Sequence, residues 1–152
     1  MADTGFAELL EMAIAEDLGL AGDVTSGAIF GEETARAVII SRQAACLAGV
    51  AYAVRVFARI DPRLECLVVK ADGMAVLPGE TVMEITGPVR SLLQAERIAL
   101  NFLAYLSGIA TQTREHVAIA RRLGNTVVLD TRKTLPGYRF LAQEAVVLGG
   151  GQ

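Results

Sequence analysis

The sequence is poor in several features that would point to other classes of protein. Among its 152 residues it has two cysteines, Cys46 and Cys66, which are too few and too apolar in setting for a disulfide framework or a zinc site. Its one histidine, His116, has no nucleophile or metal-ligand partner at helical spacing. No apolar run reaches the roughly 18 residues typical of a membrane span, and the acidic start differs from a signal peptide. We therefore expect a cytoplasmic protein with reduced cysteines and no membrane partner.

Excess positive charge is also lacking. The chain has 14 Lys and Arg residues against 17 Asp and Glu residues, which gives a formal net charge of −3. Without a clustered basic face, nucleic acid is not an expected partner. The hydrophobic content of 53% indicates a globular chain with a core of its own. Any site for an anion must then be a local pocket in an acidic protein.

Residues 1–108 carry apolar patterns that predict a sheet with covering helices. Gly108 is expected to interrupt the longest helical pattern, and residues 22–26 are expected to form a turn. Because the predicted strands are joined by short turns, we expect an α+β domain with a mostly antiparallel sheet. Three helices are expected: a first one that ends near Gly19, and two at residues 51–60 and 89–107. Strands are expected at 34–41, 64–70 and 81–86, and residues 47–50 form an apolar element of ambiguous type.

Residues 109–152 predict a second unit in a helix, strand, loop and helix order. The helices are expected at 109–123 and about 138–148, and the apolar strand at 126–129. A parallel strand is buried on both faces and needs neighbours, so the unit is interpreted as the opening β/α unit of a truncated α/β barrel. We expect the residues after Gly124 to be loosely held. The glycines at 149–151 indicate a flexible linker or a tight loop that approaches a phosphate.

The functional signal lies in the loop DTRKTLPG, Asp130 to Gly137. Arg132 and Lys133 are adjacent cations at the carboxyl end of a predicted strand, where α/β proteins place their ligands. A guanidinium fork and a compact ammonium together suit a small anion with several charges, and Thr131 and Thr134 add hydroxyls. On spacing alone, a basic dipeptide in a turn is also typical of a solvated surface loop.

Three long segments, in order along the chain, carry a resemblance to a known family. They are EDLGLAGDVTS at 16–26, QAERIALNFLAYLSGIATQTR at 94–114, and DTRKTLPGYRFLAQEAVVLGGGQ at 130–152. Together they resemble quinolinate phosphoribosyltransferase, also called carboxylating nicotinate-nucleotide pyrophosphorylase. The resemblance implies an N-terminal α+β domain at 1–108 and the start of the phosphoribosyltransferase α/β barrel at 109–152.

The resemblance also implies a reaction and a set of binding residues. The phosphoribosyl group of phosphoribosyl pyrophosphate would pass to quinolinate with loss of carbon dioxide, giving nicotinate mononucleotide for NAD biosynthesis, with Mg²⁺ bound to the donor. Arg132, Lys133 and Thr134 match the family's anion-binding positions. Arg97, in the AER motif, matches an arginine that reaches the neighbouring subunit's site in a homodimer or higher even oligomer. No catalytic residue and no metal ligand is assigned.

Two departures from the family pattern stand in the helix after the loop. Gln143 replaces a common lysine and Glu144 a common aromatic residue, so this helix is less basic than expected. The family's later substrate, phosphate and metal contacts would lie beyond Gln152, so we expect a fragment that is inactive alone. Two alternatives stay open: a related phosphoribosyltransferase-like protein of the molybdate-transport type, and a non-catalytic dimerisation or binding module.

Overall fold

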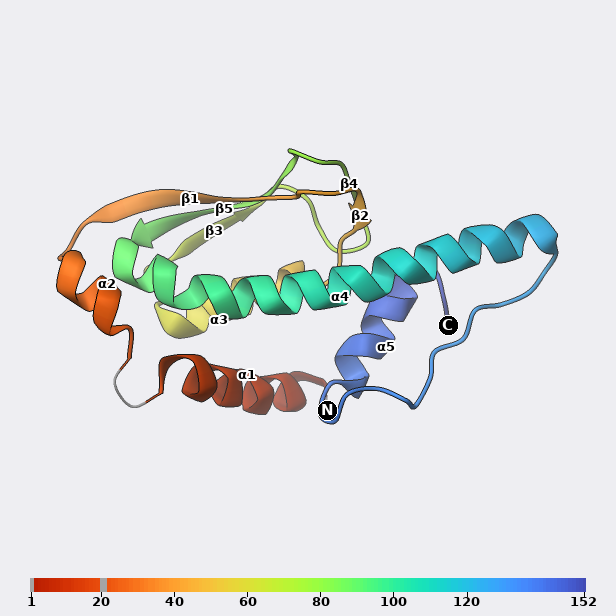
Figure 1. Cartoon of the computed structure of the whole chain (residues 1–152), viewed down its shortest axis with the longest axis horizontal. Coiled ribbons are helices and arrows are strands. Elements are labelled where there is room, and N and C mark those ends of the chain that lie inside the picture. The colour runs from red at the N-terminus through yellow and green to blue at the C-terminus, as the bar shows by residue number, and fades with distance from the viewer. Residues whose placement is uncertain (1, 20–21) are drawn as a thin grey trace.

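The computed structural model describes residues 2–19 and 22–152, with side chains from Gly5 onward outside that gap (Figure 1). The long helix α4 runs along the molecule, with a sheet on one side and helices α1 and α5 on the other. No helix in these ranges is long and apolar enough to cross a membrane. The elements, in chain order, are α1 (Ala2–Leu18), α2 (Val24–Ile29), β1 (Thr34–Ile40), β2 (Ala45–Cys46), α3 (Val50–Ile60), β3 (Glu65–Val68), β4 (Ala75–Val76), β5 (Thr81–Pro88), α4 (Val89–Leu123) and α5 (Arg139–Leu148).

The main sheet is antiparallel, as the sequence predicts. Strand β5 lies at its centre, between β1 and β3, so that Ala37 and Cys66 both lie opposite Ile85. The pairing of β1 with β5 shifts register between Ile39 and Ile40. Helix α4 packs against β5 and helix α3 against β3; Ile85 of β5 is buried, while Leu67 on β3 stays exposed. The α+β expectation for this region is confirmed.

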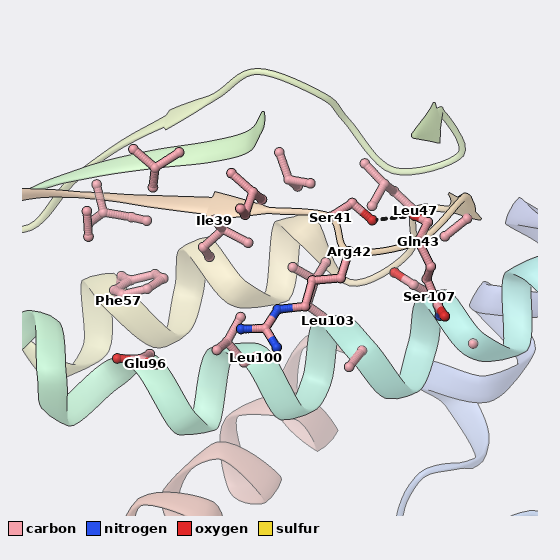
Figure 2. Close-up of a pocket in the computed structure, with 18 of the residues that line it drawn as sticks. Ile39, Ser41, Arg42, Gln43, Leu47, Phe57, Glu96, Leu100, Leu103 and Ser107 are labelled. Atoms are coloured by element: carbon pink, nitrogen blue, oxygen red, sulfur yellow. Dashed lines mark hydrogen bonds between the residues drawn. The ribbon is translucent and has the colours of Figure 1, made fainter. Parts of the chain in front are cut away.

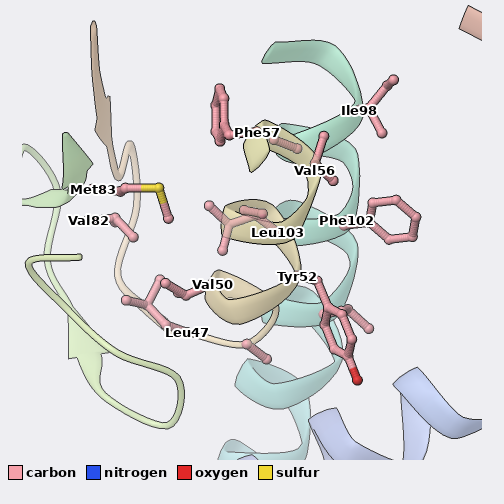
Figure 3. Packing of buried hydrophobic residues seen from close by; sticks show 14 of the residues in the cluster. Leu47, Val50, Tyr52, Val56, Phe57, Val82, Met83, Ile98, Phe102 and Leu103 are labelled. Atoms are coloured by element: carbon pink, nitrogen blue, oxygen red, sulfur yellow. The ribbon is translucent and has the colours of Figure 1, made fainter. Parts of the chain in front are cut away.

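The core lies between α3, α4 and the central strand (Figure 3). Helix α3 turns Val56 and Phe57 towards Leu103 of α4 and Met83 of β5, and all four side chains are buried. Gly49 lets α3 begin close to α4: its φ is +94°, and an added Cβ would lie 3.2 Å from the carbonyl oxygen of Phe102. Helix α4 is therefore the central element, against which α3 and the sheet pack.

The expected helix break at Gly108 is wrong. Helix α4 continues through it as one helix from Val89 to Leu123. A glycine inside a helix costs roughly 0.5–1 kcal/mol relative to alanine, which buried neighbours can offset. Leu106 and Ala110, on either side, are 1% and 0% exposed. The predicted boundary between residues 108 and 109 therefore lies inside a continuous helix and stays a prediction.

The expected turn at residues 22–26 is also wrong in part, because it opens the short helix α2. The side chain of Asp23 accepts a hydrogen bond of 2.9 Å from the backbone N–H of Ser26, which caps the first turn. Hydrogen bonding with Ser26, first with its side chain and then with its backbone N–H, lowers the pKa of Asp23 below its usual value. The apolar element at 47–50 is not a strand: it links the short strand β2, paired with β4, to α3.

The expected strand at 126–129 forms only the beginning of a parallel pair. The backbone there belongs to no strand, but the N–H of Gln152 donates to the carbonyl of Val128 (2.9 Å) and the N–H of Asp130 donates to the carbonyl of Gln152 (2.8 Å). One residue bonded to two positions of a neighbouring segment is the pattern of a parallel ladder. With α5 between the two segments, this arrangement is consistent with the opening of an α/β barrel.

The expectation that everything after Gly124 is loosely held is wrong for α5. Leu141 and Ala145 are 0% and 1% exposed and belong to the same core as α3 and α4. The glycines after α5 bring it close to α4, because a Cβ on Gly149 would lie 2.6 Å from the carbonyl oxygen of Ala110. The glycine run is therefore a packing element here, and the flexible-linker interpretation is wrong.

Candidate functional site

The loop Asp130–Gly137 is fixed at both ends and shaped by a turn. Its start is tied to Gln152 by the parallel pair, and its end runs into α5. Pro136 and Gly137 form the predicted turn, in which the N–H of Tyr138 donates to the carbonyl of Leu135 (3.1 Å). Gly137 has a φ of +81°, which suits the third position of a type II turn. A short loop is thus held between two anchored segments.

The cations of this loop face solvent. Arg132 and Lys133 are exposed, and their side chains make no hydrogen bond or ion pair with any other residue in the described ranges. Thr134, which follows them, is half-buried. The backbone N–H of Lys133 donates to the hydroxyl of Thr131 (3.2 Å), so this hydroxyl shapes the loop from within. The structure therefore brings three of the four predicted binding residues together, with both charges unpaired among the described residues.

Arg97, the fourth predicted residue, lies elsewhere. It is exposed on α4, and no hydrogen bond or ion pair joins it to another described residue. At about 1.5 Å per residue, the part of α4 from Arg97 to Leu123 is roughly 39 Å long. The chain then folds back beneath α4 as the loop (Figure 1). The structure does not join Arg97 to the loop of its own chain.

Two side chains of α5 hold the loop, and sequence reasoning assigned neither of them this role. Gln143 donates from Nε2 to the Oδ2 of Asp130 (2.5 Å), and Arg139 approaches the carbonyl oxygen of Arg132 to 3.5 Å. They are four positions apart, which places them on one face of the helix. The available signal was this i, i+4 spacing of polar residues directly after the loop.

An aromatic cluster fixes the beginning of α5. The ring of Tyr138 stacks on Phe102 with centroids 6.1 Å apart and meets the ring of Tyr105 edge-on at 5.5 Å. Tyr52 donates its hydroxyl to the carboxylate of Glu144, one of the two departures from the family pattern. Burial, followed by the bond to Glu144, raises the pKa of Tyr52 well above its usual value. Glu144 thus has a structural partner.

A second candidate, the groove between β1 and α4, has a different chemistry (Figure 2). It has a volume of about 1020 Å³ and is lined mainly by apolar side chains such as Ile39, Leu100 and Leu103. Arg42 reaches from the end of β1 towards α4, and Glu96 lies on the same helix. None of the four predicted binding residues lines it. An apolar groove does not suit a ligand with several negative charges, so the loop remains the better candidate.

The described residues do not form a metal site. No group of three or more His, Cys, Asp or Glu side chains within the ranges 2–19 and 22–152 lies close enough together to hold an ion. Asp130, the acidic residue of the loop, accepts its hydrogen bond from Gln143. The exposed His116 uses Nδ1 in a contact of 2.7 Å with the carbonyl of Gln112 in its own helix.

Comparisons with known proteins agree on one family. The profile "Quinolinate phosphoribosyl transferase, N-terminal domain" matches residues 23–107, and the corresponding "C-terminal domain" profile matches residues 109–152. The chain is 41% identical over 146 residues to a probable carboxylating nicotinate-nucleotide pyrophosphorylase of Bacillus subtilis, covering 95% of this chain and 49% of the relative. It is 35% identical to the chloroplastic enzyme of Oryza sativa subsp. japonica, covering 95% and 38% respectively.

Solved structures lead to the same result. The nicotinate-nucleotide pyrophosphorylase of Francisella tularensis superposes with a TM-score of 0.92 at 34% identity, covering 97% of this chain and 52% of that one. NadC of Streptococcus pyogenes gives a TM-score of 0.89 at 38% identity, covering 96% and 52%. The chain thus spans about half the length, or less, of the relatives that it matches.

Proposed function

The chain belongs to the quinolinate phosphoribosyl transferase family, and from this premise we propose that it supplies part of an enzyme that transfers a phosphoribosyl group to quinolinate. The donor would be phosphoribosyl pyrophosphate, and the reaction would release pyrophosphate and carbon dioxide and leave nicotinate mononucleotide for NAD biosynthesis. The observation that carries the proposal is the exposed pair Arg132 and Lys133 in an anchored loop, both without an ion-pair partner in the part of the chain that the structure describes.

The charges of the substrates account for this pair. Quinolinate has two adjacent carboxylates, and the donor has a pyrophosphate and a phosphate. Cations without an internal partner can bind such groups without first breaking an ion pair, and Arg132 can present a planar fork to a carboxylate. Catalysis in a site of this kind is mainly positioning and stabilisation of a leaving anion, so it requires no nucleophilic side chain.

Arg97 fits the proposal through a second subunit. We propose that it serves the site of a neighbouring copy in a homodimer or higher even oligomer. In support, Arg97 is exposed on α4 and makes no hydrogen bond or ion pair with the described residues of its own chain. We further propose that Mg²⁺ enters with the donor, since the described residues do not build a site for it. The free cysteines, Cys46 and Cys66, fit our proposal of a cytoplasmic location.

The proposal is tested by titrating the chain with quinolinate in a calorimeter. Arg132→Ala should weaken binding roughly ten- to hundredfold, because a charge-assisted hydrogen bond contributes about 1.5–3 kcal/mol. Arg121→Ala is the matched control, since Arg121 is also exposed and has no hydrogen bond or ion pair within the described part of the chain. Equal affinities for the wild type and Arg132→Ala would remove the loop from the site. Binding of another anion in preference to quinolinate would favour the related transport-type family.

Transfer activity is tested in a chimera. Residues 1–152 would replace the matching half of the Bacillus subtilis relative, to which they are 41% identical over 146 residues. The chimera should form nicotinate mononucleotide, and Arg97→Ala and Arg132→Ala should each abolish this activity. Mixing these two variants should restore part of it, because a hybrid dimer has one site with both arginines. No recovery after verified subunit exchange would contradict the role of Arg97.

A further inference from the structure

We propose that Gln143 is a positioning residue that keeps the carboxylate of Asp130 away from Arg132 and Lys133, so that both cations stay free for an anion. The inference rests on the proposed function, because it assigns a task to a residue outside the predicted set. It concerns a neutral side chain that touches no ligand itself. Its effect would act entirely through Asp130.

The contacts around Asp130 carry this inference. Within the described part of the chain its side chain accepts one hydrogen bond, from the amide of Gln143 at 2.5 Å. Gln143 stands one turn into α5, and Leu141 and Ala142 on the same helix are buried in the core. The amide is therefore presented by an anchored helix, while the carboxylate belongs to an exposed loop. The position of Gln143 on α5 therefore determines the orientation of the carboxylate.

The position of the charges makes this direction matter. Asp130 stands two and three positions before Arg132 and Lys133, whose side chains have no hydrogen bond or ion pair within the described residues. An unrestrained carboxylate so close in sequence would pair with one of them, and an exposed ion pair of this kind is worth up to about 1 kcal/mol. A ligand would have to break that pair. The hydrogen bond from Gln143 engages the carboxylate without consuming either cation.

A double-mutant cycle with inorganic pyrophosphate as the probe tests the proposal. Gln143→Ala should weaken pyrophosphate binding by the chain roughly two- to fivefold, the range of an exposed ion pair. In the background of Asp130→Asn the same substitution should have no effect, because no carboxylate remains to compete. Gln143→Lys, which can still hold Asp130, should bind at least as tightly as the wild type.

The control is Gln112→Ala, which removes an exposed helical glutamine whose side chain has no hydrogen bond within the described residues and should leave affinity unchanged. The proposal is overturned if Gln143→Ala has no effect. It is equally overturned if the loss is the same with and without the Asp130 carboxylate, since that result would mean a general disturbance of α5.

A spectroscopic measurement separates this inference from the proposed function. If the wild type binds neither pyrophosphate nor quinolinate, the loop loses its assigned role, yet the positioning can still be measured by NMR. In Gln143→Ala, proton exchange with water at the Arg132 guanidinium or the Lys133 ammonium should slow, because Asp130 pairs with one of them. Exchange rates equal to those of the wild type at both groups would contradict the proposal without any ligand.

Discussion

The loop Asp130–Gly137 and helix α5 are neighbours in sequence but are held in opposite ways. The helix buries Leu141 and Ala145 completely or almost completely in the core. The loop exposes Arg132 and Lys133 and is held by a few hydrogen bonds: two at Asp130, one from α5 to the carbonyl of Arg132, and those within the loop itself. Apolar burial stabilises the helix, and local polar contacts shape the loop.

This difference separates stability from binding. The anchored helix fixes the end of the loop, through Tyr138 against Phe102, and its start, through Gln143. The charged groups between these anchors contribute no internal pairs in the described chain, so their unpaired charge remains available to a ligand. The substitutions below test this separation, beginning with the largest expected loss of stability.

The strongest test is Leu141→Ala. Leu141 is 0% exposed, and truncating a buried leucine leaves a cavity that costs about 2–5 kcal/mol. The free energy of unfolding, measured with urea, should fall by that amount in a single transition. Val147→Ala in the same helix is the control: Val147 is 62% exposed, so its truncation should cost less than about 0.5 kcal/mol. Equal, small losses would mean that α5 is not part of the core.

The second test removes a buried charge that holds two elements together by hydrogen bonds. Asp61 is buried at the end of α3, where its carboxylate accepts hydrogen bonds from Arg63 (2.8 Å) and from the hydroxyl of Ser91 (2.6 Å). These partners, Arg63 first, hold the pKa of Asp61 well below its ordinary value of 3.8. Asp61→Asn should lower the free energy of unfolding at pH 7 by about 1–3 kcal/mol.

The pH dependence of this difference has a definite sign. Because the pKa of Asp61 is lower in the folded state, the unfolded chain takes up a proton first as the pH falls. The stabilisation is complete above the unfolded pKa of 3.8 and is lost progressively below it. The difference between wild type and Asp61→Asn should therefore shrink between about pH 5 and pH 2.

A smaller effect is expected at the polar contact between α3 and α5. Tyr52→Phe removes the hydroxyl that donates to Glu144 and keeps the ring, whose centroid lies 4.4 Å from that of Phe6. One hydrogen bond contributes about 0.5–1.5 kcal/mol, so the melting temperature should fall slightly. Tyr105→Phe, which loses a hydroxyl without a hydrogen bond within the described chain, should not lower it. A loss as large as that of Leu141→Ala would mean that polar contacts also seat α5.

The sequence predicts most helices and strands of residues 1–108, because the spacing of apolar residues indicates which face of each element is buried. The expected strands at 34–41 and 81–86 and the helix at 51–60 correspond closely to β1, β5 and α3. The break expected at Gly108 failed because helix propensity is local, whereas Leu106 and Ala110 are buried by partners distant in sequence. The packing of α5 in the core was missed for the same reason, because its partners on α3 and α4 are distant in sequence.

Of the candidate site, the sequence predicts the charged residues but not their support. Residue types and order identify Arg132 and Lys133 as a basic pair in a turn. The contact of Gln143 with Asp130 depends on how α5 folds back on the loop, which no local pattern encodes. The role of Arg97 concerns a second subunit and stays a prediction.

The smallest loss of stability is expected where the binding charges themselves are removed. Arg132→Ala and Lys133→Ala delete exposed side chains without internal partners in the described chain, so each should change the free energy of unfolding by no more than about 0.5 kcal/mol. Removing both should be equally mild, and relief of repulsion between adjacent cations should offset part of any cost. Urea unfolding of the two single variants and the double variant measures this directly. A loss above about 1 kcal/mol in either single variant would show that these cations hold the loop together. The loop residues would then contribute to stability as well as to binding, and the difference between helix α5 and the loop would not hold.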